Sequence, residues 1–393
     1  MALFYLWLCS TPRTGNLQFA TSAVSAPASS PNLVFTTDLP TSVSEADVVL
    51  IAVNTPTKSH GRGAGEATDM AAFEVVTELV SRHANPGTII VEKSTVPCRT
   101  AKLLAIHRPG VHFDVLSNPE FLAAGTAVAD LLHADRILIG SSNTPSGHRA
   151  AAALASVYAS WIPQSRIITT NVFSSELAKL VANAMLAQRI SSINSIAAVC
   201  DETGADVDEV ARAIGADPRI GRQFLRAGIG FGGSCFKKDV LSLVYLAETL
   251  VLPEVADYWR AVIAMNEFAR NRFVSRVIKG LNNTLAGKKV TVLGYAFKKD
   301  TNDTRESPAL DIIRSLAEEG PKEIAIFDPL CIPAQIMDEV SGFAGLRALQ
   351  SRGGRVAVYA DAYAACQGSH AVLITTEFDE FKNTPSERTL EHL

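Results

Sequence analysis

Short, continuous apolar runs recur along this chain and are separated by longer stretches with helical patterning. The runs Ala46–Val53 and Thr88–Glu92 flank a helix that we expect to extend from its N-cap, Asp69, to about Arg82. A continuous apolar strand is buried on both faces, which is typical of a parallel sheet covered by helices. The sequence therefore predicts a doubly wound α/β domain. Its further elements are expected at Asn32–Thr37, Val115–Asn118, Arg136–Ile139, Thr144–Ser160 and Arg166–Thr170.

The middle of the chain is predicted to be helical, and the strand-and-helix rhythm returns near its end. Long helices are expected from Ser174 to about Cys200 and over Val255–Leu281, and we expect the second to join two domains and to form a dimer interface. A second, smaller Rossmann-like domain is predicted after them, with strands in 288–297, Ile324–Phe327 and Ala371–Thr376, following shorter helices at Val207–Ala213 and Phe236–Leu250. The expected boundaries are 1–31 for a disordered leader outside the fold, 32–172 for an incomplete first domain, 173–285 for a helical central domain and 286–393 for the last domain.

Composition excludes several classes of protein. The net charge of −4 over 393 residues gives no basic surface for nucleic acid. The six cysteines (9, 98, 200, 235, 331 and 366) show no CxxC spacing, which favours free thiols in a reducing, cytoplasmic location and no metal site. No apolar run is long enough to span a bilayer, and Met1–Cys9 lacks the charged region of a signal peptide. Residues 10–31 are rich in Ser, Thr, Pro and Ala and are expected to be poorly ordered.

The segment 228–239 combines glycines with a cysteine at a predicted helix start. Four glycines within six positions leave a backbone that a ligand can approach closely. Cys235 then lies at the N-terminus of the next helix, where the helix dipole and the neighbouring Lys237 and Lys238 favour a thiolate. Asp239 follows one turn later on the same face. This pattern indicates a nucleophilic cysteine, and the alternative is a turn beside a buried, unreactive thiol.

Two further groups have both a functional and a structural interpretation. Lys179 and Asn183 are spaced i, i+4 on a predicted helix with many apolar neighbours, so the lysine needs a partner and could stabilise an oxyanion. Glu120 follows Asn118 and Pro119 at the end of a strand, where it could act as a base or simply face solvent.

The sequence Gly-Phe-Gly-Gly-Ser-Cys-Phe-Lys-Lys-Asp (230–239) resembles the catalytic-cysteine loop of the nucleotide-sugar dehydrogenases, the UDP-glucose/GDP-mannose dehydrogenase family. The similarity runs through Asn32–Phe381 and is clear in Ser117–Gly125, Glu176–Ser195 and Gly294–Ser307. It implies an NAD-dependent, four-electron oxidation of a sugar alcohol to a carboxylate, with UDP-glucose as the favoured nucleotide sugar.

The resemblance also implies roles for individual residues. Cys235 would form a thiohemiacetal and then a thioester, Lys179 and Asn183 would stabilise the oxyanion, and Glu120 would act as the base. Thr95 and Asp239 would order the water. The cofactor residues implied are Val53, Asn54, Thr55, Pro56, Thr57, Ser94, Thr95, Val96 and Arg305. The substrate residues implied are Glu120, Phe121, Leu122, Ala123, Lys179, Asn183, Arg219, Arg226, Phe231, Gly232 and Lys298.

The sequence departs from the family pattern at three places. It has no GxGxxG motif after a first strand, and it stops before the Asp-Gly-Arg segment that contacts substrate in the family, so we expect a chain truncated at both ends. Ala124 stands where the family commonly has a second acid, and we assign it no polar role. The alternatives are a non-catalytic remnant that binds UDP-sugar or serves as an oligomer scaffold, and a dehydrogenase of another nucleotide sugar.

Overall fold

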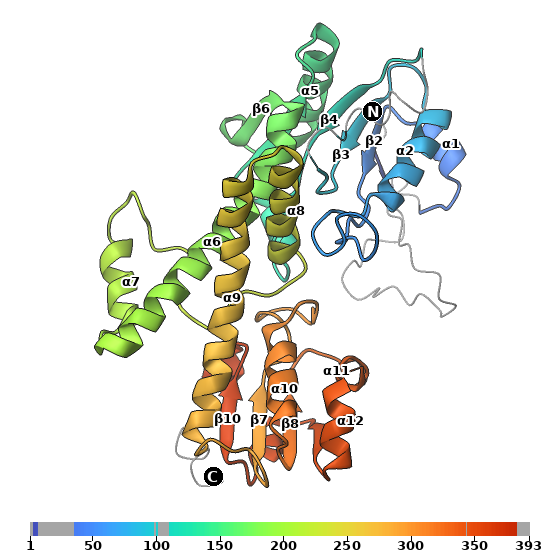
Figure 1. Cartoon of the computed structure of the whole chain (residues 1–393). Helices are drawn as coiled ribbons and strands as arrows, with labels where there is room; N and C mark the ends of the chain where they lie inside the picture. Colours follow the sequence, from blue (N-terminus) through green and yellow to red (C-terminus); the bar gives the residue numbers. More distant parts are fainter. Residues whose placement is uncertain (1–2, 7–34, 98–99, 101–109, 343, 383–393) are drawn as a thin grey trace. The chain divides into compact units, whose positions relative to one another are not determined.

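The computed structural model describes residues 3–6, 35–97, 100, 110–342 and 344–382 (Figure 1). The chain divides into two compact units. The first comprises Met1–Phe121 and Ala129–Lys179, and the second comprises Leu122–Val128 and Leu180–Leu393. Among the residues that the structure describes, none of the helices combines the length and apolar character needed to cross a bilayer.

The first unit contains a sheet whose described strands follow the order β1-β2-β3-β4-β5-β6. Neighbouring strands are parallel, except that β5 is antiparallel to β4 at the pair Ser117 and Gly140. The strands are β1 (Leu3–Leu6), β2 (Val48–Ile51), β3 (Ile89–Glu92), β4 (Asp114–Ser117), β5 (Ile137–Ser141) and β6 (Ile167–Asn171). The helices are α1 (Leu39–Ser44), α2 (Ala71–His83), α4 (Ala127–Leu132, which spans the boundary between the units) and α5 (Pro145–Tyr158), followed by the 3-10 turn Gln164–Arg166.

Both faces of this sheet are buried, which explains its continuous apolar runs. Successive residues of a strand point to opposite faces. Ile51 belongs to one core with Phe73 of α2, whereas its neighbour Leu50 belongs to another core with Leu154 of α5. Helices on both faces therefore require an apolar residue at every position of β2.

The second unit contains a smaller parallel sheet in the order β10-β7-β8-β9. Its core joins Val290 and Val292 of β7 to Ile312 and Leu316 of α10. The strands are β7 (Lys289–Leu293), β8 (Glu323–Phe327), β9 (Arg355–Val358) and β10 (Ala371–Ile374). The helices are α10 (Pro308–Glu318), α11 (Pro333–Ser341), α12 (Ala344–Ser351), α13 (Ala362–Cys366) and α14 (Asp379–Lys382).

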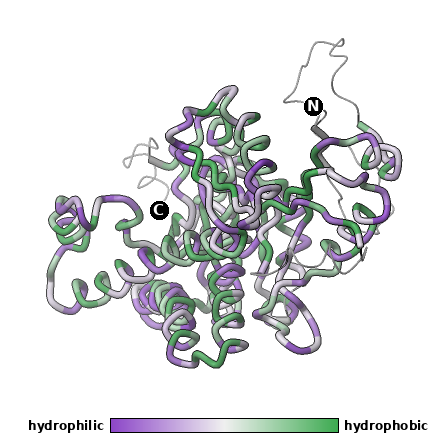
Figure 2. The backbone as a smooth tube through the Cα atoms, turned by 90° about the horizontal axis from the view of Figure 1, so that it is seen from above, coloured by the Kyte–Doolittle hydropathy of each residue, from purple (hydrophilic) through white to green (hydrophobic). Residues whose placement is uncertain are grey.

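Helices, most of them long, form much of the rest of this unit. They are α6 (Val172–Thr203, which begins in the first unit), α7 (Val207–Gly215), α8 (Phe236–Thr249) and α9 (Pro253–Gly280). Ala184 of α6, Leu243 of α8 and Val262 of α9 share one core, and α8 and α9 run side by side in Figure 1. Figure 2 shows that hydrophilic and hydrophobic residues are interspersed along the helical parts of the backbone.

The predicted fold class is confirmed, with parallel sheets near both ends and long helices between them. Three local predictions differ from the structure. Residues 3–6, assigned to a leader outside the fold, form β1 and pair with β2, while residues 7–31 of that leader lie outside the described residues. The strand predicted at Asn32–Thr37 is wrong for its described part, since residues 35–37 are not extended into a ladder. Asp69 accepts a hydrogen bond from Ala71 N, but the N-cap position of α2 is Met70.

Candidate active site

Cys235 is the N-cap residue of α8 and is exposed. Its carbonyl accepts the first helical bond, from Asp239 N at 2.9 Å, and its Sγ lies 3.9 Å from Ser234 Oγ. The other cysteines that the structure describes, Cys200, Cys331 and Cys366, are all buried. Burial raises the pKa of Cys331 and of Cys366, so these thiols are unreactive near neutral pH. Among the described cysteines, accessibility therefore singles out Cys235.

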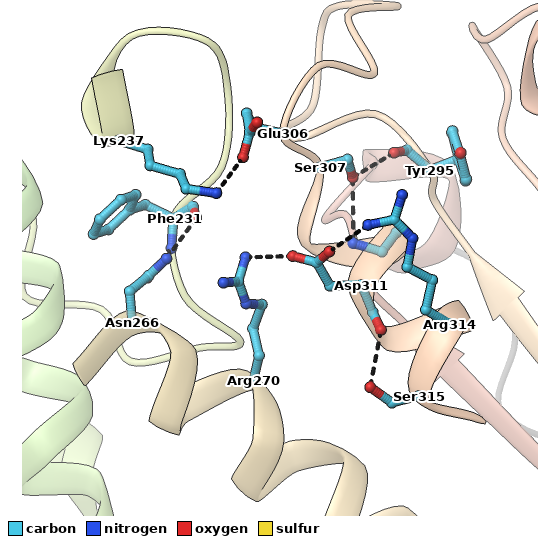
Figure 3. A network of polar contacts seen from close by, with 11 residues as sticks. Phe231, Lys237, Asn266, Arg270, Tyr295, Glu306, Ser307, Asp311, Arg314 and Ser315 are labelled. Atoms are coloured by element: carbon cyan, nitrogen blue, oxygen red, sulfur yellow. Dashed lines mark hydrogen bonds and ion pairs between the residues drawn. The ribbon is translucent and has the colours of Figure 1, made fainter. Parts of the chain in front are cut away.

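Side chains from two helices hold the glycine loop before Cys235. Asn266 of α9 accepts a hydrogen bond from Phe231 N at 2.7 Å and donates one to Phe231 O at 3.0 Å (Figure 3). Asn194 of α6 accepts a bond from Gly228 N at 2.8 Å. The backbone groups of this loop have no partners within a helix or strand, so these side chains provide their hydrogen bonds and hold the loop in place.

Two of the loop glycines allow close approaches that no other residue would. Gly230 has φ of 101°, and a Cβ there would lie 2.5 Å from Asn266 Oδ1. Gly233 has φ of 85°, and a Cβ there would lie 2.7 Å from the ring of Phe297. The Gly233 amide also donates to Glu306 O at 3.3 Å. The loop is therefore packed directly against the segment that follows β7.

The charges near Cys235 are mostly paired. Lys238 Nζ lies 2.7 Å from Asp239 Oδ1, and Lys237 Nζ lies 2.9 Å from Glu306 Oε2 (Figure 3). The positive charge that the sequence predicted beside the sulfur is thus largely offset by carboxylates. Arg305 is a further cation, and it makes two bonds to Asp303, at 2.8 and 2.7 Å. Those bonds are the main cause that raises the pKa of Arg305.

Asp239 and Asn183, predicted as catalytic residues, meet in the structure. Asn183 Nδ2 donates to Asp239 Oδ2 at 2.5 Å, and the carboxylate is 1 % exposed. Because Asp239 also binds Lys238, each of its oxygens has a partner. An amide carries two N–H donors, so Asn183 retains one for another acceptor.

Glu120 and Lys179, also predicted as catalytic residues, form an ion pair in the first unit. Lys179 Nζ lies 3.3 Å from Glu120 Oε1, and the lysine is 4 % exposed. The centroid of the Phe121 ring lies 5.3 Å from Lys179 Nζ and 3.9 Å from the guanidinium carbon of Arg136. The lysine therefore has the partner that its burial requires.

The turn that carries Glu120 is fixed by the buried side chain of Asn118. Asn118 Nδ2 donates to Leu138 O at 2.8 Å. Its Oδ1 accepts hydrogen bonds from the Tyr158 hydroxyl at 2.6 Å and from Lys93 Nζ at 3.2 Å. The Asn-Pro turn is therefore held by three neighbouring elements.

The predicted cofactor segments lie at the carboxyl ends of β2 and β3, where ligands of such sheets bind. Ser94 Oγ accepts a bond from Val53 N and donates one to Val53 O, both at 2.8 Å. Thr55 Oγ1 donates to Thr95 O at 2.8 Å. Two polar loops are thus fixed to each other at neighbouring strand ends, and this arrangement fits one wall of a dinucleotide site. The remaining members of the two segments are Asn54, Pro56, Thr57 and Val96.

The predicted substrate residues are found in several settings. Arg219 is paired with Asp217 at 2.6 Å, and Arg226 with Glu377 at 2.8 Å. Lys298 follows β7 and lies against its neighbouring phenylalanine ring. A cavity of about 180 Å³ beside α7 is lined by Asp208, Ala211, Arg212, Arg222, Leu225 and Arg226.

The uncharged substrate residues lie within packed segments. Phe231 is buried and contacts the ring of Phe236 edge-on, with 5.7 Å between the centroids. Gly232 has no room for a Cβ beside Glu306 O. Leu122 and Ala123 belong to the second unit, whereas Glu120 and Phe121 belong to the first.

Sequence reasoning missed Asn266 and Lys93. Asn266 lies 35 residues from Phe231 in the sequence, and no local spacing indicates that pair. For Lys93 a signal was present, because a lysine directly after a buried strand must find polar partners.

Models of one protein family match three parts of the chain. The NAD binding domain of the UDP-glucose/GDP-mannose dehydrogenase family matches residues 19–162. The central domain matches residues 173–268, and the UDP binding domain matches residues 291–392. The first match begins at residue 19, earlier in the chain than Asn32, where the similarity described above begins.

Individual relatives match over most of their length. The UDP-glucose 6-dehydrogenase of Drosophila melanogaster is 50% identical over 367 residues, covering 92% of this chain and 77% of the relative. That of Pongo abelii is 52% identical over 362 residues, covering 91% and 73%. A solved UDP-glucose dehydrogenase from Pyrobaculum islandicum superposes with a TM-score of 0.77 at 32% identity, covering 90% of this chain and 77% of that one. The chain belongs to the UDP-glucose/GDP-mannose dehydrogenase family.

Proposed function

We propose that this chain oxidises UDP-glucose to UDP-glucuronate with NAD as cofactor. The observation that carries the proposal is the exposed Cys235 at the start of α8, held on a clamped glycine loop in a chain about half identical to UDP-glucose 6-dehydrogenases. Four-electron oxidation of an alcohol passes through an aldehyde, which carries no second hydride to give unless a nucleophile adds to it. An accessible thiol meets that need.

Cys235 is assigned the role of nucleophile. Its sulfur adds to the aldehyde carbon to form a thiohemiacetal, and oxidation of this adduct gives a thioester. Lys179 and Asn183 are assigned the stabilisation of the oxyanion, for which each offers an N–H donor. When bound, NAD would accept one hydride, and a second NAD molecule bound in turn would accept the other. The loops Val53–Thr57 and 94–96, together with Arg305, are the residues assigned to hold it.

Glu120 is assigned the role of base in thioester hydrolysis. Its position after the fixed Asn118 turn and its ion pair with Lys179 at 3.3 Å support a defined orientation for its carboxylate. Asp239 and Thr95 are assigned the ordering of the attacking water. Asp239 is held on both oxygens, so it can act as a rigid acceptor.

The diphosphate and sugar of the substrate are assigned to Arg219, Arg226 and Lys298, with Glu120–Ala123, Phe231 and Gly232 as further contacts. Two guanidinium groups match the geometry of phosphate oxygens. Both arginines now face carboxylates on the surface, pairs that contribute little in water and can be exchanged for a phosphate.

A homo-oligomer in the cytoplasm completes the proposal. Apolar side chains are exposed on the long helices, including Ile196 and Val199 on α6 and Phe268 on α9. Such surfaces favour pairing with a second copy. Sedimentation at micromolar concentration checks this part, and a monomer would contradict it.

The test of the proposed function is product formation from a panel of nucleotide sugars. With UDP-glucose and NAD we expect two NADH for each UDP-glucuronate, because each hydride removes two electrons. GDP-mannose and a UDP-N-acetyl hexose are the comparison substrates, and preference for either would contradict the assignment of UDP-glucose. Binding of NAD and UDP-glucose without NADH formation would indicate a non-catalytic member of the family.

A further inference from the structure

Lys93 lies directly after β3 in the first unit, and the mechanism above does not use it. Its Nζ lies 3.2 Å from Asn118 Oδ1 and 3.5 Å from the Tyr158 hydroxyl. It is one of two donors to the side-chain oxygen of Asn118, two residues before Glu120. Asn118 itself is 1 % exposed, so the network around it is buried.

The charged groups that face Lys93 come from two other elements. Glu120, after β4, attracts its ammonium group, and Lys179, from α6, repels it. The titratable hydroxyl of Tyr158, from α5, also faces it, at 3.5 Å. Glu120 is therefore influenced by two ammonium groups, one in direct contact at 3.3 Å and one held by the turn that carries it.

Burial lowers the pKa of Lys93 to about 8, against the opposing attraction of Glu120 and with a smaller contribution from Lys179. An ordinary lysine keeps its charge to about pH 10. The ammonium group of Lys93, which faces Glu120, therefore loses its charge as the pH rises through about 8.

We propose that Lys93 is a positioning residue for Glu120, and that its ammonium charge is needed for fast hydrolysis of the thioester. The proposal rests on the function proposed above. In the hydrolysis of the thioester, the oxygen of water bonds to the thioester carbon, and a proton of water passes to the Glu120 carboxylate. The carbon–sulfur bond then breaks, the sulfur leaves as a thiolate, and no electrons are transferred.

The physical reason is orientation by two cations. Lys179 Nζ holds the carboxylate of Glu120 through its ion pair at 3.3 Å. The attraction of Lys93, whose ammonium group is bound to Asn118, adds to that of Lys179 in orienting the carboxylate. Misplacement of a base by a fraction of an ångström costs much of its effect. Lys93 does not touch the substrate in this account, and it acts through the position of Glu120.

The experiment compares three variants of the full chain. Lys93→Met removes the charge and keeps a similar volume, whereas Lys93→Arg keeps the charge. Tyr158→Phe removes the other donor to Asn118 Oδ1 and leaves the lysine charge, so it separates anchoring of the turn from electrostatics. Lys322→Met, the same substitution at an exposed lysine in the second unit, is the matched control.

The readouts are kcat against pH, KM for UDP-glucose, and the mass of the intact protein after acid quenching during turnover. For Lys93→Met we expect kcat at pH 7 to fall about tenfold, KM to change little, and a sugar adduct to accumulate on Cys235. We expect kcat of the wild type to decline as the pH rises through about 8, and we expect this decline to be absent in Lys93→Met. In Lys93→Arg the decline should move to higher pH, with kcat at pH 7 within about threefold of wild type.

A Lys93→Met variant with the kcat, pH profile and quenched mass of wild type would overturn the proposal. It would also be overturned if Tyr158→Phe reproduced the whole effect, because anchoring alone would then explain it. A wild-type chain that forms no NADH contradicts the proposed function itself. An active wild type with an unaffected Lys93→Met contradicts only the role of Lys93.

Discussion

Asn266 of α9 binds both backbone polar groups of Phe231, four residues before Cys235. The donor and acceptor of one amide side chain thus replace the partners that a strand neighbour would provide. Phe231 is buried, so its N–H and C=O have no access to water if this side chain is removed. The position of the nucleophile depends on a residue that belongs to a different helix.

Replacement of Asn266 by Ala should destabilise the protein by about 2–4 kcal/mol, since two buried backbone groups lose their partners. The free energy of unfolding in urea checks this. Asn271→Ala, at an exposed position of the same helix, should change stability by less than about 0.5 kcal/mol. Equal stabilities of the two variants would show that Asn266 does not hold the loop.

Gly233→Ala should reduce both stability and activity, because its Cβ would meet the Phe297 ring at 2.7 Å. Gly353 is the matched control. Its φ of 82° is close to the 85° of Gly233, but nothing lies within 4 Å of its Cβ position. Backbone strain should cost each variant about 1 kcal/mol, and the clash should cost Gly233→Ala a further 1–3 kcal/mol or so.

Thermal unfolding and kcat with UDP-glucose distinguish the two glycine variants. We expect Gly353→Ala to keep wild-type kcat. Gly233→Ala should lose roughly tenfold or more, because the loop that carries Cys235 must shift. Indistinguishable kcat values would mean that the packing of the loop on Phe297 has no part in catalysis.

Val251→Asn should stabilise the protein by about 1 kcal/mol. Val251 has φ of 59° between α8 and α9 and is 82% exposed, so a β-branched residue is strained there without burying its side chain. Asn tolerates the left-handed region. Val75→Asn on α2, which is exposed but helical, should give no gain in Tm, and a gain at that site alone would contradict this explanation.

Glu92→Gln should stabilise the protein increasingly as the pH rises. Burial raises the pKa of Glu92 well above its ordinary value of 4.5, and the facing Glu176 raises it further. Below pH 4.5 the carboxyl group is protonated in both states. Above it the unfolded chain releases the proton and folded Glu92 keeps it, so the folded state loses up to about 1.4 kcal/mol per pH unit.

Urea unfolding at pH 5 and pH 8 measures this effect. The gain of Glu92→Gln over wild type should grow by about 1–3 kcal/mol between the two values. Exposed Glu202→Gln should show no such growth. A constant difference across this range would mean that Glu92 is ionised in the folded protein.

The alternation of strands and helices could be predicted from the sequence because burial on both faces leaves a local pattern. Thr144 and Ser307 cap α5 and α10 through their hydroxyls, so those helix starts also have a local cause. β9 could not be predicted in this way. It is a short edge strand whose first residue, Arg355, pairs with the distant Glu323 at 2.7 Å.

In the candidate site, too, local features could be predicted and contacts between distant residues could not. Cys235 could be predicted because a helix start and a glycine run are local features. Its charge environment could not be predicted, since Lys237 pairs with Glu306, which lies 69 residues away in the sequence. Likewise, no local spacing indicates that Asn118 binds Tyr158, 40 residues away.

The central claim is that the sulfur of Cys235 carries the sugar between the two oxidations. The most direct measurement is UDP-glucuronate formation by Cys235→Ser beside Cys366→Ala, a substitution at a buried thiol that takes no part in the mechanism. We expect Cys366→Ala to form two NADH for each UDP-glucuronate, and Cys235→Ser to stop at the aldehyde level with UDP-glucuronate formation about 10²-fold slower or more. Normal turnover to UDP-glucuronate by Cys235→Ser would contradict the account.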